Sequence, residues 1–392
     1  MSRTDTPRLG RIQAGALIVG VLGLAGCAIG WYLEPAQFFS AYLVAWMYWL
    51  GIPLGAIATV AVLHVAGGAW ALAIRRPLEA AMITLPLLAL LFVPLLFGMP
   101  YLYPWIRPEA AADPVIAHKL LYLNFAGFVA RAALYFVIWI ILSYLFNRWS
   151  LAQDRSADRG PSQRLRSLGP PALILYFLTV TFAVIDWVMS LQPTWYSTIY
   201  GALFVIGNGL VTLAFAIVVV ALLAKRPPLA GALSANTFHD LGNLLLTFVI
   251  IWAYFSFSQL LIIWAGNLPE EIQFYTIRSQ GGWSWVGIFM AICQFVLPFF
   301  VLLSRAVKRR AWALGALAAG LMLIHAIEMF WLVMPPLRPV LAVHWLDLAA
   351  LLGIGGIWLA AFAWRLSRHP LLPVSQPQEV FAHEGHEAPG RP

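Results

Sequence analysis

The sequence predicts an all-α integral membrane protein with about ten transmembrane helices. Hydrophobic residues make up 62% of the 392-residue chain and charged residues only 10%, whereas a typical soluble domain has about 25% charged residues. The mean hydropathy of +0.83 agrees with this composition. The apolar residues also form segments long enough to cross a bilayer, because about 20 helical residues span a hydrocarbon core of roughly 30 Å.

The expected spans follow one another with little soluble sequence between them. They are residues 12–33, 41–64, 78–98, 119–146, 171–191, 202–224, 241–266, 283–304, 311–333 and 344–366. Prolines inside the spans predict kinks that leave backbone carbonyls free to face neighbouring helices or water. These prolines are Pro53, Pro86, Pro94 and Pro298.

The basic residues orient the chain. Most of the 24 Lys and Arg residues fall in segments on the same side as the N-terminus, and the opposite side holds only Arg107, Lys119, Arg278 and Arg338. The positive-inside rule therefore places both termini in the cytoplasm. The expected domains are a cytoplasmic N-terminal segment (1–11), a ten-helix transmembrane domain (12–366) and a flexible cytoplasmic tail (367–392). The basic loops are short and lack a binding motif, so nucleic acid is not an expected partner.

The metal and cofactor ligands of this chain are sparse. Cys27 and Cys293 lie in different spans, which excludes an iron–sulfur cluster, a covalent haem or a disulfide framework built by this chain alone. Residues 24–27 resemble a lipidation signal, but apolar residues continue to Leu33, which favours a first membrane helix. A haem b would need two histidines at matched depth, for which His64 and His239 are the only candidate pair. We predict no metal site and no bound haem.

Two charged side chains lie inside the expected spans. Asp186 falls in span 171–191 and Arg131 in span 119–146, and each costs at least ~2.5 kcal/mol at the centre of a bilayer. Arg131 is the expected partner of Asp186, although its expected depth differs by about 10 Å at 1.5 Å per residue. Either a structural ion pair or a functional site explains these charges.

A polar ridge runs along the span 241–266. Its residues recur at spacings of three, four and seven and so share one face of the helix. The ridge consists of Asp240, Asn243, Thr247, Tyr254 and Ser258. It extends over about 27 Å of helix rise. A line of this length inside the protein is a candidate proton or water path, and ordinary hydrogen bonding between helices is the alternative.

Other ionisable residues form two groups at half depth, as two proton half-channels require, although membrane-interface residues form the same pattern. The outer group includes the pairs His325–Glu328 and His344–Asp347, and the inner group includes His239 and Asp240. The candidate proton pathway comprises Asp186, His239, Asp240, Thr247, Tyr254, Ser258, Arg131, His325 and Glu328. A possible quinone site comprises His118, Tyr122, Asp186 and Gln259, which could hydrogen-bond the head group.

Several blocks of residues resemble a known family. They are residues 118–124 with Arg131, 186–198, 238–243, 252–255, 257–259 and 264–271. In this order, and with ten spans, the chain resembles the NrfD/PsrC-type integral membrane proteins. It is most similar to the ActF-type subunits of alternative complex III, a bacterial quinol:cytochrome c oxidoreductase. The motif positions carried over from the resemblance are His118, Arg131, Asp186, His239 and Asp240.

The resemblance implies a fold of two four-helix bundles with a flanking helix at each end, in a bacterial inner membrane. It implies as partners a paralogous ten-span subunit, an iron–sulfur subunit and c-type cytochromes. Haem c and iron–sulfur clusters would then lie on the partners, this chain would bind no cofactor by itself, and a quinone such as menaquinone is its one candidate ligand. The quinol pocket is expected in the paralogue, and no catalytic residue is expected here.

The leading functional hypothesis is a respiratory subunit that scaffolds quinol oxidation and conducts protons. A purely structural anchor is the first alternative, in which the buried charges only hold the assembly together. A secondary transporter is the second, and its binding site would lie near the midplane beside broken helices.

Overall fold

The computed structural model describes residues 6–155, 160–225, 229–230 and 233–371, and helices account for nearly all of them. The helices are α1 (Thr6–Leu33), α2 (Pro35–Ala66), α3 (Ala69–Met82), α4 (Leu85–Leu90), α5 (Val93–Phe97), α6 (Met99–Leu102), η1 (Pro104–Ile106), η2 (Pro108–Ala112), α7 (Pro114–Lys119), α8 (Phe125–Arg155), α9 (Gly160–Trp187), η3 (Met189–Leu191), α10 (Tyr200–Leu223), α11 (Ala235–Gly266), α12 (Pro269–Arg278), α13 (Trp283–Met290), the π-helical η4 (Ala291–Val296), α14 (Leu297–Leu303), α15 (Arg305–Lys308), α16 (Ala311–Val333) and α17 (Trp345–Ser367).

Ten segments of the described chain are long and apolar enough to cross a membrane. They are Leu9–Leu33, Pro35–Ala66, Trp70–Phe97, Phe125–Arg155, Gly160–Leu191, Tyr200–Leu223, Ala235–Gly266, Trp283–Leu303, Ala311–Val333 and Trp345–Ser367. The prediction of an all-α protein with ten membrane-length helices is therefore confirmed. Of the predicted tail, residues 372–392 lie outside the described residues, as do residues 1–5 of the N-terminal segment.

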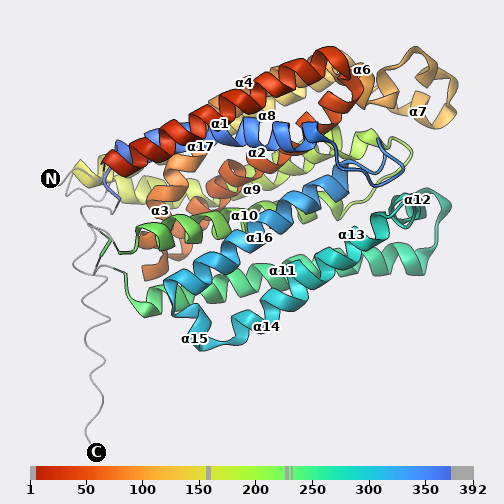
Figure 1. Ribbon diagram of the computed structural model, residues 1–392. Helices are drawn as coiled ribbons and strands as arrows, with labels where there is room; N and C mark the ends of the chain where they lie inside the picture. Colours follow the sequence, from red (N-terminus) through yellow and green to blue (C-terminus); the bar gives the residue numbers. More distant parts are fainter. Residues whose placement is uncertain (1–5, 156–159, 226–228, 231–232, 372–392) are drawn as a thin grey trace, which may run out of the picture.

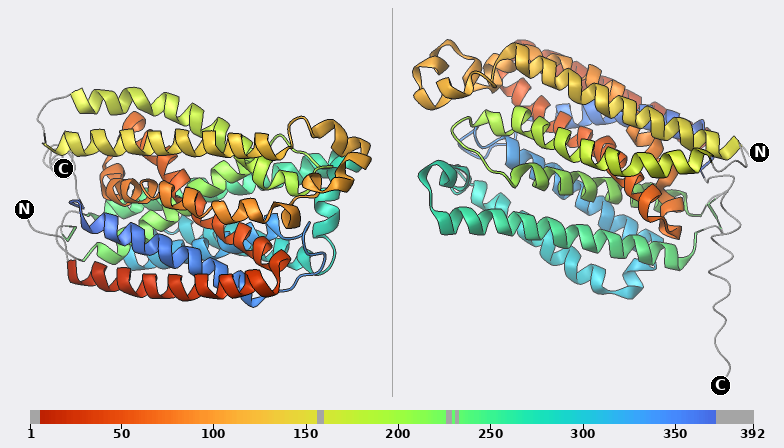
Figure 2. Two further views of the ribbon diagram at one scale, coloured as in Figure 1. Left: turned by 90° about the horizontal axis from the view of Figure 1, so that it is seen from above. Right: turned by 180° about the vertical axis from the view of Figure 1, so that it is seen from behind.

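The long helices lie side by side along one common direction (Figures 1 and 2). The first residues of α1 and the last of α17 lie at the same end of the molecule, together with Arg75, Arg76 and Arg155, and we call this the basic end. The short helices α7 and α12 lie at the opposite end. This arrangement follows from the alternating direction of successive membrane-length helices.

Helix α10 forms the centre of the molecule. Of its most apolar stretch 83% is buried, whereas only 22% of the corresponding stretch of α11 is buried. Helix α10 packs against α2, α9, α11 and α16, while α8 packs on α9 and α4, and α11 packs on α14. Helices α11, α13 and α14 therefore form one edge of the molecule (Figure 1).

Glycines join the first helix to the last. Gly20 and Gly23 of α1 meet Gly353 and Gly356 of α17 so closely that a Cβ on Gly23 would lie 2.5 Å from the Cα of Gly353. Helices that approach this closely in a membrane are stabilised by backbone packing, because lipid provides no hydrophobic driving force between them. Helix α1 is thus attached at the periphery through α17.

Proline divides two of the spans. Pro86 and Pro94 stand in the first turns of α4 and α5, so the third span is a chain of short helices rather than one. Pro298 follows the π-helical η4 in the first turn of α14. Pro53, in contrast, lies within the continuous α2. Kinks were predicted at all four prolines. The helix is interrupted at Pro86 and Pro94, whereas α2 continues through Pro53.

The predicted start of the fourth span is wrong. The span was expected from residue 119, but α8 begins only at Phe125. The Asn124 side chain explains this start, because its Oδ1 accepts a hydrogen bond from Gly127 N at 2.8 Å, and its Nδ2 donates to the carbonyls of Leu120 and Leu121. An asparagine at this position satisfies a backbone donor that the first helical turn would otherwise leave unpaired.

Candidate functional site

Asp186 and Arg131 form a buried ion pair near the opposite end of the molecule. The Nε and Nη2 atoms of Arg131 each donate to one carboxylate oxygen of Asp186 at 2.9 Å. The hydroxyl of Tyr135 donates to Oδ2 of the same carboxylate at 2.8 Å. The Asp186 side chain is fully buried, while that of Arg131 remains 20% exposed. Three donors thus hold a carboxylate that has no access to water.

The loop before α8 fixes the position of Arg131. The Tyr122 carbonyl accepts a hydrogen bond from Arg131 Nη1 at 3.0 Å, and the guanidinium carbon lies 3.8 Å from the centre of the Tyr122 ring. Burial, followed by the negative charge of Asp186, raises the pKa of Tyr122 to about 12. Tyr122 therefore remains a neutral phenol beside the ion pair.

The expected depth difference between Arg131 and Asp186 is wrong. Because α8 begins at Phe125, Arg131 lies only about 9 Å from the start of its helix. Asp186 is the last residue but one of α9. The two side chains therefore meet directly, without the stagger that the sequence required.

Glu328 is the centre of a second buried cluster. Its Oε1 accepts from Trp252 Nε1 at 2.6 Å, and its Oε2 accepts from Gln294 Nε2 at 2.6 Å. His325 Nδ1 lies 2.8 Å from the same Oε2. His325 and Glu328 are 1% and 5% exposed. Residues from α11, η4 and α16 thus meet at one carboxylate.

Two polar atoms of this cluster remain without a partner. His325 Nε2 and Gln294 Oε1 are buried and form no hydrogen bond within the described residues. Gly207 of α10 packs closely against the ring, since a Cβ there would lie 3.0 Å from His325 Cε1. Gln294 lies in a π-helical turn, a feature that often occurs at functional sites. The ring of His325 therefore has one nitrogen beside the Glu328 carboxylate and one nitrogen without a partner among the described residues.

The polar ridge of α11 faces outward. The Tyr254 side chain is 65% exposed, Asn243 and Thr247 are exposed, and Ser258 is half-buried. Asp240 is 46% exposed and lies 3.8 Å from His239. Trp252, which reaches Glu328, lies on the other face of the same helix. The expectation that the ridge lines an interior seam of this chain is therefore wrong.

The four residues of the possible quinone site do not meet. Tyr122 and Asp186 lie together, but His118 is exposed on α7. Gln259 is buried on α11, its Oε1 has no partner, and no described hydrogen bond or ion pair connects it with Asp186. Whether this chain contacts a quinone stays a prediction, with Tyr122 as the member closest to the exposed edge of the ion pair.

A third polar network, at the basic end, was missed by the sequence reasoning. Glu79 accepts from Arg75 Nε at 2.8 Å, from Arg76 Nη1 at 2.6 Å, and from Ser150. Arg76 also pairs with Asp154. The two arginines and Glu79 are at most 4% exposed. The spacing of Glu79 at three and four residues after the arginines is the signal that could have revealed the network.

Comparisons with known proteins give no assignment. The sequence matches no protein-family model, and a search of curated proteins finds no match. Within the described residues, no group of three or more His, Cys, Asp or Glu side chains could hold a metal ion. The functional argument therefore depends on the three buried networks, the outward ridge and the resemblance of the sequence blocks.

Proposed function

We propose that this chain is a proton-conducting membrane subunit of a larger respiratory complex that oxidises quinol and reduces a c-type cytochrome. The observation that supports a place in a larger complex is the exposed polar ridge along the membrane-length helix α11. Tyr254 lies near the middle of the 32-residue α11 and has no hydrogen-bond partner among the described residues. A hydroxyl without a partner in an apolar environment costs about 1–3 kcal/mol in proteins.

A second membrane protein would remove this cost. The ridge extends from Asp240 to Ser258 on α11, which forms one edge of the molecule together with α13 and α14 (Figure 1). Because lipid tails offer neither donors nor acceptors, a polar line at this depth is stabilised by helices that hydrogen-bond to it. We assign this edge to the contact with a partner subunit, with Thr247 near its centre.

The resemblance of the sequence blocks supports one particular assembly. An ActF-type subunit would contact a paralogous ten-span subunit, an iron–sulfur subunit and c-type cytochromes, and it would lie in a bacterial inner membrane with the basic end in the cytoplasm. Helices α2 to α9 and α10 to α16 would then be the two four-helix bundles, with α1 and α17 as the flanking helices. Haem c, the iron–sulfur clusters and the quinol pocket would belong to the partners.

Proton conduction is assigned to the inward-facing carboxylate Glu328. The His325 ring can take a proton at its free Nε2 and release the Nδ1 proton to Glu328 Oε2, which changes the carboxylate to a neutral acid. Glu328 lies about 8 Å from the end of α16 at 1.5 Å per residue, so release toward the opposite end is short. His239 and Asp240 would admit protons at the basic end, along the subunit contact.

A structural anchor is the second candidate, and the Arg131–Asp186 pair favours it. The three described donors to Asp186 belong to this chain, and both carboxylate oxygens accept from them. A pair that is balanced in this way stabilises the folded chain without exchanging protons. We therefore assign conduction to Glu328 and a structural role to Asp186.

The subunit contact is tested by placing a bulky side chain on the ridge. Thr247→Trp is expected to reduce recovery of the partner subunits on affinity purification by at least about tenfold, since a loss of 1.4 kcal/mol weakens binding tenfold. The matched control is Ile174→Trp, because Ile174 of α9 is 62% exposed and lies outside the ridge. Equal recovery with both variants on blue-native gels would show that the ridge is not the contact.

The proton assignment is tested by Glu328→Gln, which keeps the size of the side chain and removes its charge. In vesicles that contain the assembled complex, quinol oxidation is expected to stay within about twofold, because the proposal places the quinol pocket in a partner subunit. The number of protons translocated per electron is expected to fall to the number that quinol oxidation releases without any pumping. Glu270→Gln, at an exposed position of α12, serves as the control. Unchanged translocation in Glu328→Gln, and in His325→Gln as a second variant, contradicts the assignment.

A further inference from the structure

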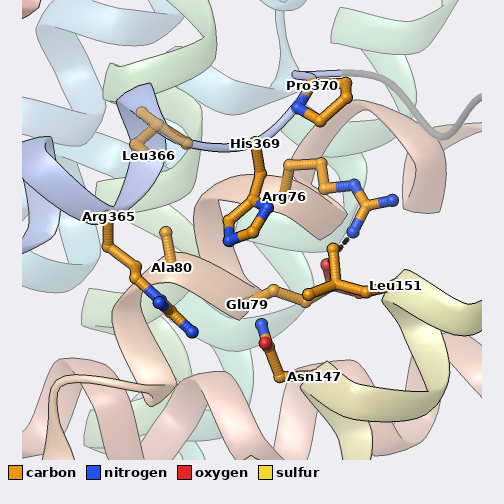
Figure 3. A pocket seen from close by; sticks show the side chains of 9 residues that line it. All are labelled: Arg76, Glu79, Ala80, Asn147, Leu151, Arg365, Leu366, His369 and Pro370. Carbon is orange, nitrogen blue, oxygen red and sulfur yellow. Dashed lines mark hydrogen bonds and ion pairs between the residues drawn. The ribbon is translucent and has the colours of Figure 1, made fainter.

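A small pocket opens at the basic end between α3, α8 and the end of α17 (Figure 3). Its polar lining is Arg76, Glu79, Asn147, Arg365 and His369. The free space within it admits about one water-sized group. The pocket therefore has space for only one atom of a ligand, and the other atoms of that ligand stay at the surface.

Three nitrogen atoms of the lining are buried and have no hydrogen-bond partner among the residues that the structure describes. They are Arg76 Nε, Arg365 Nε and His369 Nε2. Arg76 is only 3% exposed, so water cannot satisfy its Nε from the bulk. The two arginine nitrogens are donors, and they require an acceptor such as an anionic oxygen.

The charges around the pocket are also unbalanced. Glu79 is shared by Arg75 and Arg76, and Asp154 pairs with Arg76. The Arg365 guanidinium has no ion pair within the described residues, and in Figure 3 it points into the pocket, toward Asn147 and Glu79. Burial and then the charges of Arg365 and Arg76 lower the pKa of His369, which agrees with a positive pocket.

We propose that this pocket binds one oxygen of a phosphate group, through Arg76, Arg365 and His369. The pocket lies where membrane-length helices end, which is the depth of lipid head groups, and basic pockets between helices bind anionic head groups there. A phosphate presents one oxygen to the narrow space and keeps its ester groups outside. Either an anionic phospholipid or free phosphate offers this chemistry.

The test measures the stabilisation of the purified full chain by added phosphatidylglycerol in neutral detergent. For Arg365→Gln, about fivefold to tenfold more lipid is expected at half-maximal stabilisation, because this variant removes a charged donor that lines the pocket. The matched control is Arg368→Gln. Arg368 is exposed three residues later, over the Trp364 ring at 4.0 Å, and its removal is expected to leave lipid binding unchanged.

Inorganic phosphate separates the two sources. Displacement of phosphatidylglycerol by millimolar phosphate supports a site for free phosphate, whereas lipid binding that resists phosphate supports a head-group site. Arg365→Lys keeps the positive charge but loses the planar guanidinium, so its lipid affinity is expected to lie between those of the unmodified chain and Arg365→Gln. If Arg365→Gln folds poorly, Arg365→Lys tests the same contact. Equal phosphatidylglycerol binding by the Arg365 variants and Arg368→Gln overturns the proposal.

Discussion

Replacement of Arg131 by leucine is expected to lower the free energy of unfolding by about 3–5 kcal/mol, because it leaves a buried charge without its partner. Asp186 is fully buried and accepts two of its three side-chain hydrogen bonds from Arg131. Tyr135 alone cannot balance the negative charge. The free energy is measured by unfolding the purified chain in mixed detergent micelles with increasing SDS.

Removal of the negative charge, by Asp186→Asn, should lower the free energy of unfolding by less. Asp186→Asn leaves Arg131 unpaired, but this guanidinium is 20% exposed and still donates to the Tyr122 carbonyl. We therefore expect Arg131→Leu to be more destabilising than Asp186→Asn. The double variant should be more stable than Arg131→Leu alone, because it no longer buries an unpaired charge. A larger loss in Asp186→Asn than in Arg131→Leu would refute this account of the pair.

Hydropathy alone was enough to find the ten membrane-length helices but not their ends. Arg75, Arg76 and Glu79 lower the local hydropathy, so the third span was predicted from residue 78, whereas α3 begins at Ala69. These charges are buried because they pair with one another. The fourth span, in contrast, was predicted to start too early. The apolar residues after 119 form turns around Asn124, and α8 starts only after them.

Periodicity identified which residues share a face but not where that face points. The ridge of α11 does share one face, yet that face is outward, and its residues include the exposed Tyr254. The inner face presents Trp252 to Glu328. The pair His325–Glu328 was visible in the sequence because both residues lie on one helix. The contacts of Trp252 and Gln294 with Glu328 could not be predicted, because a contact between helices depends on how each helix is rotated about its axis.

The network at the basic end allows the sharpest comparison between buried and exposed charges. Glu79 is 2% exposed and accepts from two arginines and Ser150. Glu79→Leu leaves both arginines buried without this carboxylate and is expected to lower the free energy of unfolding by about 3 kcal/mol or more.

Glu34 provides the matched control for Glu79, because it also pairs with a basic residue but at the surface. Its side chain is 57% exposed and lies 3.5 Å from His344. Glu34→Leu is expected to cost at most about 1 kcal/mol, since water screens such a pair. SDS titration of both variants gives the two values. Similar losses would mean that the burial of Arg75 and Arg76 does not depend on Glu79, whereas a loss about three times larger for Glu79→Leu follows if the two buried arginines need this carboxylate.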